Sequence, residues 1–121
     1  MNQELSLIKI FLITLLGYFF LIPNIVSAEL IATLKQNNKL IFIRHALAPG
    51  NGDPDEFNIL DCNTQRNLDS VGREQSLRLG QYFKINDIPI EAVLSSEWCR
   101  CKETAKLAFQ NYETFKPLNS F

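Results

Sequence analysis

The sequence lacks several features that would place the protein in common functional classes. It has no excess of basic residues, since it contains 12 lysines and arginines against 13 aspartates and glutamates, and the formal net charge is −1. A nucleic-acid-binding domain would normally carry a basic stripe or patch. Histidine is almost absent, because His45 is the only one, and the three cysteines cannot form two pairs. A metal site built from histidine and cysteine would therefore have too few ligands.

Long apolar segments are equally scarce, and the main one lies near the N-terminus. The run Ile10–Ile22 has thirteen residues, whereas a helix that spans a bilayer needs roughly 20. Pro23 interrupts the run, and Val26-Ser27-Ala28 then supplies the small residues that a signal peptidase requires. We therefore predict a signal peptide over residues 1–28 and a periplasmic or secreted mature domain over residues 29–121. The alternative is an uncleaved membrane anchor, and membrane contact is expected only through this segment.

The mature region predicts alternating helices and strands. Lys39–Arg44 encloses a continuous apolar run, which is typical of a strand buried on both faces of a parallel sheet. Residues 45–67 show no periodicity and contain several prolines and glycines, so we expect a long loop. Asp69 is a suitable N-cap for the helix that follows. The other expected elements are a helix over 29–37, a helix over 70–85, a strand over 92–95, a helix from Ser96 and a strand within 113–121.

The expected helix over 70–85 carries small residues on one face. Gly72, Ser76 and Gly80 recur at steps of four, so this face is able to approach a sheet closely. The order of helices and strands predicts an α/β fold, a three-layer α/β/α sandwich with a mostly parallel sheet that is incomplete at the C-terminus. The helix then serves as the right-handed crossover between two parallel strands.

Charged residues follow both expected strands at the point where each strand ends. Arg44 and His45 follow the first strand, and the segment Ser95–Arg100 follows the second and opens a helix. In open α/β sheets ligands bind beyond the carboxyl ends of the strands, and a helix N-terminus favours an anion. Two arginines, a lone histidine and a helix N-terminus at one edge of the sheet therefore predict a phosphate-binding site.

Three segments resemble those of a known family in the same order. Leu-Ile-Phe-Ile-Arg44-His45-Ala46 resembles the Arg-His-Gly signature of the histidine phosphatase (phosphoglycerate mutase-like) superfamily. Residues 65–75 resemble the segment that opens the helix after this signature. Residues 95–105 resemble the serine-rich strand end that carries the second arginine of the family, here Arg100. The likeness extends over residues 38–109.

The resemblance implies hydrolysis of a phosphomonoester or phosphoanhydride through a phosphohistidine. His45 would attack phosphorus as a neutral imidazole, and water would then release phosphate. Arg44 and Arg100 would hold the phosphoryl oxygens with their planar forks. Asn51 is a further candidate donor, and Asp53 is the candidate general acid for the leaving group. The implied partner is a small phosphorylated substrate, and no metal or organic cofactor is implied.

The sequence departs from the family pattern at two points. Ala46 replaces the glycine that usually follows the nucleophile, and alanine is small enough for the consequences to be mild. The resemblance also implies a second active-site histidine from a C-terminal part, whereas His45 is the only histidine and the sequence stops before such a part. We therefore expect a C-terminally truncated domain with low or no activity. The alternatives to an exported phosphatase are an inactive phosphate-binding module and a non-functional fragment.

The mature region keeps three cysteines, and an odd number in an exported protein suggests one disulfide and one free thiol. Cys62 lies in the expected loop and Cys99 at the facing strand-to-helix turn. We therefore predict that these two cysteines pair and that Cys101 stays free. A bridge between Cys99 and Cys101 would be strained at such short spacing.

Two arginines also have simpler interpretations. Arg100 lies at helical spacing from Glu97 and Glu103, so an ordinary surface ion pair with either glutamate is an alternative to phosphate binding. Arg66 is expected to hold the loop rather than to bind a ligand.

Overall fold

The computed structural model describes residues 22–119 of the chain and contains two compact units, one within Met1–Lys39 and one within Leu40–Phe121. The first unit holds the helix α2 (Ile22–Leu34), so the predicted helix over 29–37 is wrong at both ends.

The predicted signal peptide lies only partly within the described residues. Most of the run Ile10–Ile22 is outside them, and the predicted cleavage point after Ala28 falls inside α2. Cleavage at this point stays a prediction. Within residues 22–119 no helix is both long enough and apolar enough to cross a membrane.

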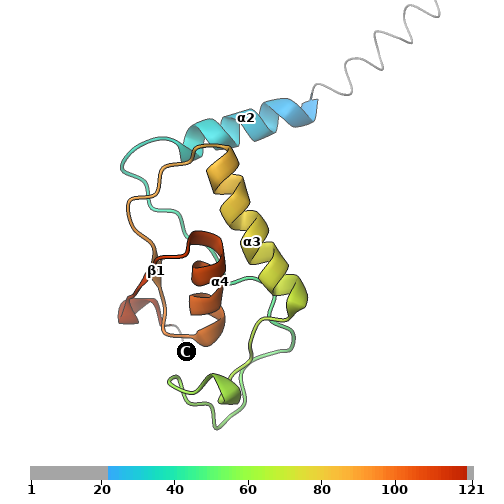
Figure 1. Ribbon diagram of the computed structural model, residues 1–121, viewed down its shortest axis with the longest axis vertical. Helices are drawn as coiled ribbons and strands as arrows, with labels where there is room; N and C mark the ends of the chain where they lie inside the picture. The colour runs from blue at the N-terminus through green and yellow to red at the C-terminus, as the bar shows by residue number, and fades with distance from the viewer. Residues whose placement is uncertain (1–21, 120–121) are drawn as a thin grey trace, which may run out of the picture. The chain divides into compact units, whose positions relative to one another are not determined.

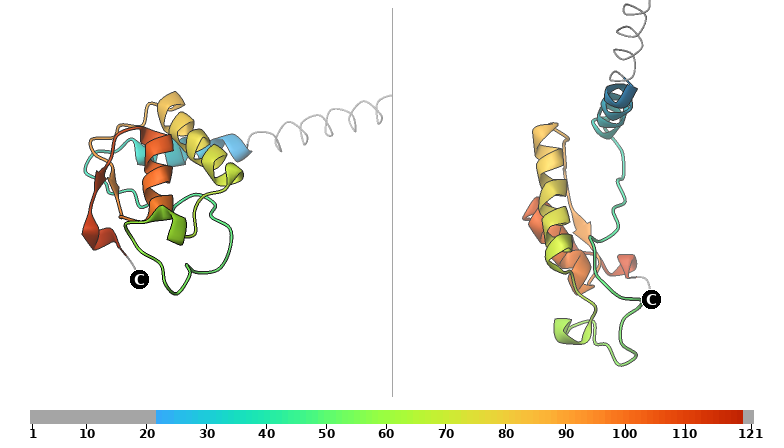
Figure 2. Two further views of the ribbon diagram at one scale, coloured as in Figure 1. Left: turned by 60° about the horizontal axis from the view of Figure 1, so that its bottom comes forward. Right: turned by 90° about the vertical axis from the view of Figure 1, so that its right-hand side faces the viewer.

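The second unit combines helices with a short parallel sheet (Figure 1). The helices α3 (Ser70–Ile85) and α4 (Cys99–Phe109) pack against each other and lie side by side in the views of Figures 1 and 2. The strands β1 and β2 are parallel, with Leu94 opposite Glu113 and Ser95 opposite Thr114. The predicted α/β class is therefore confirmed, whereas the three-layer sandwich stays a prediction. In chain order the elements are η1 (Cys62–Thr64), α3 (Ser70–Ile85), β1 (Leu94–Ser95), α4 (Cys99–Phe109), β2 (Glu113–Thr114) and η2 (Lys116–Leu118).

The helix α3 has the bounds that the sequence predicts. The Asp69 carboxylate accepts a hydrogen bond from the Gly72 N–H at 2.7 Å, as expected of an N-cap. Near the other end Phe83 is buried and meets Phe109 of α4 edge to face, with 5.3 Å between the ring centroids. This aromatic pair forms part of the core between the two helices.

The small residues of α3 face a loop and a helix, not a sheet. A Cβ added at Gly72 would lie 2.0 Å from the Leu47 carbonyl oxygen, and one at Gly80 would lie 2.1 Å from the Ala108 carbonyl oxygen. The prediction that this face packs on a sheet is wrong, because the start of the long loop and α4 occupy that side. The predicted close approach is nevertheless present, and it holds the loop against α3.

The predicted strand over 39–44 is not formed, since residues 39–49 belong to no helix or strand. Exposure alternates along this segment: Leu40 and Phe42 are 86% and 82% exposed, whereas Ile41 and Ile43 are 41% and 44% exposed. Such alternation indicates an extended backbone with one face partly covered and the other open. A strand buried on both faces needs paired neighbours and two covering layers. Within residues 22–119 the sheet contains β1 and β2 alone, so the segment has no paired neighbour, and the exposure of Leu40 and Phe42 shows that one of its faces is uncovered.

The remaining predicted elements are present with different bounds. The strand expected over 92–95 is the shorter β1, and the strand expected within 113–121 is β2, followed by the turn η2. The helix expected from Ser96 begins three residues later, at Cys99. The long loop over 45–67 is confirmed, and within it only η1 forms a helical turn.

Candidate phosphate site

Two segments that are far apart in the sequence meet at the start of α4. The Ala46 N–H donates to Thr104 Oγ1 at 3.1 Å, and that hydroxyl donates to the Arg100 carbonyl oxygen at 2.8 Å. The Leu47 N–H donates to Gln75 Oε1 of α3 at 2.9 Å. These bonds confirm that the segments expected to follow the two strands lie together, although the first of them follows no strand.

His45 is half-buried, and a bond to its own chain sets the orientation of its ring. Nδ1 lies 2.7 Å from the Ala46 carbonyl oxygen, which is only an acceptor. Nδ1 therefore carries the proton in the neutral ring, and Nε2 keeps the lone pair. A free lone pair on Nε2 is what nucleophilic attack on phosphorus requires.

The surroundings of His45 favour its neutral form. Burial lowers the pKa of His45 below its ordinary value of 6.5, and the positive charges of Arg100, Arg66 and Arg44 lower the pKa further. The hydrogen bond to the Ala46 carbonyl oxygen acts in the opposite direction and is outweighed. The imidazole is therefore neutral at neutral pH, and three arginines lie close enough to act on it.

We expect the titration midpoint of His45 to lie below 6.5. Because the pKa is lowered in the folded chain, the ring stays neutral as the pH falls through 6.5 and takes up its proton only at lower pH. His45 is the only histidine, so NMR of the imidazole protons reports on it alone. Arg100→Ala should raise the midpoint by removing a nearby positive charge. Arg78→Ala should not, since Arg78 pairs with Glu74 on the exposed surface of α3. A midpoint at or above 6.5 in the unmodified protein would contradict this result.

Arg100 is buried and held by three groups. Its side chain is 9% exposed, and Nη1 donates to Asp53 Oδ1 at 2.8 Å and to the Arg66 carbonyl oxygen at 3.4 Å. Its Cζ lies 4.4 Å from the centroid of the Trp98 ring, within the range of a cation–π interaction. Nε is buried without a hydrogen-bond partner.

The simpler interpretation of Arg100 is wrong. Glu103 pairs with Arg73 at 2.7 Å, and Glu97 accepts a hydrogen bond from Asn119 at 2.8 Å. Both glutamates therefore have other partners, and Arg100 reaches across to the long loop instead.

Asp53 and Arg66 connect the long loop to the site. Asp53 Oδ1 accepts the Arg66 N–H at 2.9 Å in addition to the bond from Arg100. Arg66 Nη1 donates to the carbonyl oxygens of Ala48 and Gly50 at 2.6 and 3.2 Å, so Arg66 holds the loop as predicted. The general-acid role of Asp53 stays a prediction, and its observed contacts are with Arg66 and Arg100.

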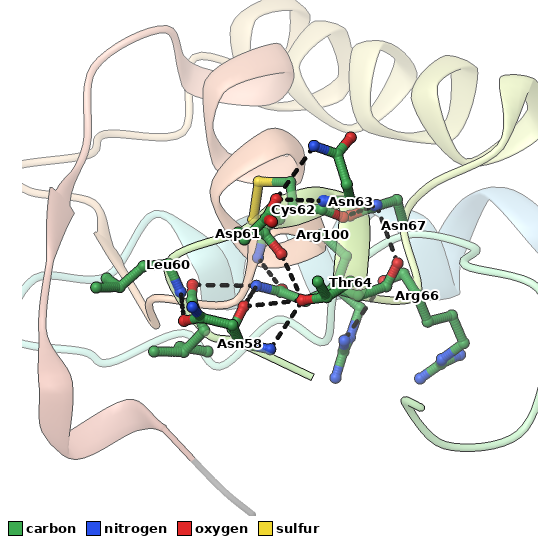
Figure 3. The surroundings of a disulfide bond; sticks show 12 residues. Asn58, Leu60, Asp61, Cys62, Asn63, Thr64, Arg66, Asn67 and Arg100 are labelled. Carbon is green, nitrogen blue, oxygen red and sulfur yellow. Dashed lines mark hydrogen bonds between the residues drawn. A yellow bond between two sulfur atoms is a disulfide. The ribbon is translucent and has the colours of Figure 1, made fainter. Parts of the chain in front are cut away.

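The predicted disulfide between Cys62 and Cys99 is present and ties the loop to the first residue of α4 (Figure 3). The two Cα atoms are 5.6 Å apart, and Cys101 is free. Gln65 Oε1 accepts the Cys99 N–H at 3.0 Å. One of the first N–H groups of α4 is thus taken by a side chain and is not available to an anion. α4 begins at Cys99 rather than at Ser96 because the backbone of Trp98 is extended, with ψ at 132°.

Two predicted site residues have no contact that fixes their side chains. Arg44 is exposed and forms no ion pair within residues 22–119, although its charge acts on His45. Asn51 is exposed in the long loop. No hydrogen bond in the described part of the chain joins Asn51 to His45 or Arg100, so its role as a donor stays a prediction.

Sequence reasoning missed the polar side chains that join the loop to the helices. Thr104, Gln65 and Gln75 each accept a backbone N–H from a distant segment, and the partners are 58, 34 and 28 positions apart in the sequence. All three lie inside segments that resemble the family, but their residue types and spacing do not indicate these partners. Such bonds depend on tertiary structure.

No group of three histidine, cysteine, aspartate or glutamate side chains that would suit a metal ion occurs in residues 22–119. Two open hollows of about 500 and 510 Å³ lie near the C-terminal ends of α3 and α4 and beside the start of β2. Neither hollow is lined by Arg44, His45 or Arg100. The residues with phosphate chemistry therefore gather elsewhere, at the start of α4.

The chain belongs to the histidine phosphatase superfamily (branch 1), whose sequence profile matches residues 40–118. This match includes the three segments in which the resemblance was noted. No protein of curated function and no solved structure matches the chain. Membership of the superfamily supports a phosphatase-type function that acts on small phosphorylated substrates.

Proposed function

We propose that this protein is an exported phosphatase in which His45 takes a phosphoryl group from a phosphomonoester or phosphoanhydride. The observation that carries the proposal is that the Ala46 N–H, next to His45, donates to Thr104 Oγ1, which in turn donates to the carbonyl oxygen of the buried Arg100. His45 keeps its Nε2 lone pair, and its surroundings lower its pKa. Family membership supports the same class of reaction. The disulfide between Cys62 and Cys99 supports export, since such bonds persist in oxidising compartments. The proposal includes a signal peptide over residues 1–28 and a three-layer domain over residues 29–121.

In the proposed reaction Nε2 of His45 attacks phosphorus while the bond from phosphorus to the leaving oxygen breaks. Arg44 and Arg100 offset the charge that spreads over the phosphoryl oxygens during transfer, and Asn51 is a further donor. Water then attacks the phosphohistidine, which releases inorganic phosphate and restores the neutral imidazole. The sequence indicates Asp53 as the candidate donor of the leaving-group proton. Its contacts support a different role.

A second candidate function is phosphate binding without turnover. It is favoured by composition, since His45 is the only histidine among the 121 residues and no second imidazole within them is available to face the phosphoryl group. The two functions differ in one measurable respect. Both require phosphate to bind beside His45, but only the phosphatase transfers the phosphoryl group to it.

Arg100→Ala is expected to weaken the binding of inorganic phosphate by roughly 100-fold, because each hydrogen bond to a charged group contributes about 1.5–3 kcal/mol. Arg100→Lys should also bind weakly, since a point charge does not reproduce the planar fork. Isothermal titration calorimetry measures both affinities, and circular dichroism confirms that the variants are folded. Arg73→Ala is the control, because Arg73 pairs with Glu103 on the exposed surface. Full affinity in the lysine variant would show that Arg100 acts only as a nonspecific positive charge.

A further inference from the structure

We infer that Asp53 is a positioning residue of the phosphate site, which holds one nitrogen of Arg100 so that the opposite edge of the guanidinium is presented to the phosphoryl group. This inference rests on the function proposed above, and it gives Asp53 a role other than that of general acid. Three observations carry it: which nitrogen Asp53 binds, how deeply the pair is buried, and how Asp53 is itself fixed.

Asp53 binds only one of the three nitrogens of Arg100. Nη1 donates to Asp53 Oδ1 and to the Arg66 carbonyl oxygen. Nε is buried without a partner, and no hydrogen bond within residues 22–119 uses Nη2. Nε and Nη2 donate in parallel from the same edge of the guanidinium, and such an edge binds two oxygens of a phosphate at once. Asp53 therefore does not compete with phosphate for these N–H groups.

The ion pair is buried at both ends. The side chains of Arg100 and Asp53 are 9% and 10% exposed, so the arginine needs a counter-ion even when no ligand is bound. The Trp98 ring covers the guanidinium, and Phe57 packs on Trp98 with 4.8 Å between the ring centroids. With Asp53 on Nη1 and an aromatic ring over one face, the guanidinium has little freedom to rotate.

Asp53 is itself fixed by the segment that precedes α3. Its Oδ1 also accepts the Arg66 N–H at 2.9 Å, and the Arg66 side chain is bonded to the loop backbone. Figure 3 shows the Arg66 and Arg100 side chains near the disulfide that ties this segment to α4. The Ala46 N–H, next to His45 in the chain, donates to Thr104 Oγ1, which donates to the Arg100 carbonyl oxygen, so the turn of α4 that carries Arg100 lies in the neighbourhood of the nucleophile.

The test compares phosphate binding by Asp53→Asn and Asp55→Asn in the full chain. Asp53→Asn keeps the shape of the side chain and removes the charge that holds Nη1. Asp55→Asn removes an exposed carboxylate from the same loop and is the matched control. Calorimetry with inorganic phosphate is expected to show affinity that is weaker by about 10- to 100-fold in Asp53→Asn, a loss of the size seen when a partner that orients a metal ligand is removed. Asp55→Asn is expected to bind as the unmodified protein does.

A kinetic measurement separates positioning from acid catalysis. p-Nitrophenolate leaves without being protonated, whereas an alkoxide needs a proton from a general acid. If Asp53 positions Arg100, Asp53→Asn lowers kcat/KM for p-nitrophenyl phosphate and for an alkyl phosphomonoester by the same factor. If Asp53 is the general acid, only the alkyl ester is slowed and phosphate affinity does not change. The second pattern would overturn the inference.

Unchanged or tighter phosphate binding by folded Asp53→Asn would also overturn it. Asp53→Glu provides a second test should the asparagine variant not fold, since glutamate keeps the charge and displaces the carboxylate by one methylene. This variant is also expected to bind phosphate more weakly, and full affinity would count against the inference. Absence of phosphate binding in the unmodified protein is a separate result. It would overturn the proposed function, and this inference with it.

Discussion

Replacing His45 by alanine is expected to reduce the hydrolysis of p-nitrophenyl phosphate to the uncatalysed rate, a loss on the order of 10³-fold or more in phosphoryl transfer. The reason is that His45 supplies the attacking atom, so its loss removes a chemical step and not merely a contact. The ring has its Nε2 lone pair free because Nδ1 is bonded to the Ala46 carbonyl oxygen. Burial and three arginines keep it neutral, and therefore nucleophilic, at neutral pH.

The loss in His45→Ala is measured against the hydrolysis rate of the unmodified 121-residue chain, and we expect that rate to be low. The resemblance implies a second histidine facing the phosphoryl group, and these residues contain only His45. Losing one preorganised donor to the developing charge typically lowers the rate by roughly 10²–10³. The absorbance of p-nitrophenolate is therefore followed at high protein concentration over long times.

Arg78→Ala is the control for His45→Ala, because it removes a surface ion pair on α3. It should leave the rate unchanged. Turnover that persists in His45→Ala would show that another group is the nucleophile. Fast, His45-dependent turnover by the 121-residue chain would show instead that the second histidine matters less than expected.

The second large effect is on stability. Replacing Cys62 and Cys99 together by serine is expected to lower the free energy of unfolding by about 3–4 kcal/mol, since the disulfide closes a loop between residues separated by 37 positions. The bond also joins the loop that carries Asp53 to the start of α4, so phosphate binding should weaken in parallel. Urea denaturation measured without reducing agent gives the change in free energy.

Cys101→Ser is the matched control, because Cys101 is free and lies in the same helix. Cys101 is half-buried, and serine is close to it in size, so the free energy of unfolding should shift by about 1 kcal/mol or less. Reducing agent should bring the unmodified protein close to the double variant and leave the double variant unchanged. A double variant as stable as the unmodified protein would contradict the structural role of the bond.

Local signals in the sequence predicted the bounds of α3 correctly, whereas the strand that they predicted over 39–44 is not formed. α3 has an N-cap and a helical apolar pattern within its own sixteen residues, so its bounds follow from local interactions. The run from Leu40 to Ile43 has an equally clear pattern, but a strand also needs a partner. Pairing is not local, and within residues 22–119 no strand pairs with this run. The segment is therefore extended without being a strand.

In the candidate site, too, features that depend on local sequence were predicted, and features that depend on distant partners were not. Arg44, His45 and Arg100 were predicted as site residues from residue type, position after an apolar run and resemblance to the family, and their roles stay predictions. The partner of Arg100 was not predicted, because Asp53 lies 47 positions away in the sequence. The glutamates at helical spacing from Arg100 are closer in the sequence and were the partners considered. The disulfide was predicted correctly because three cysteines allow few pairings and one of them is strained.

The assignment of His45 as the phosphoryl acceptor is tested most directly by locating the phosphoryl group on the chain. The protein is mixed with p-nitrophenyl phosphate, quenched in alkali, which preserves phosphohistidine, and digested for mass spectrometry. We predict a phosphorylated peptide in which fragmentation places the group on His45. We also predict that this peptide is missing from His45→Ala and that its signal is reduced in Arg100→Ala. Phosphate on another side chain, or turnover with His45 unmodified at every time point, would contradict the proposed mechanism.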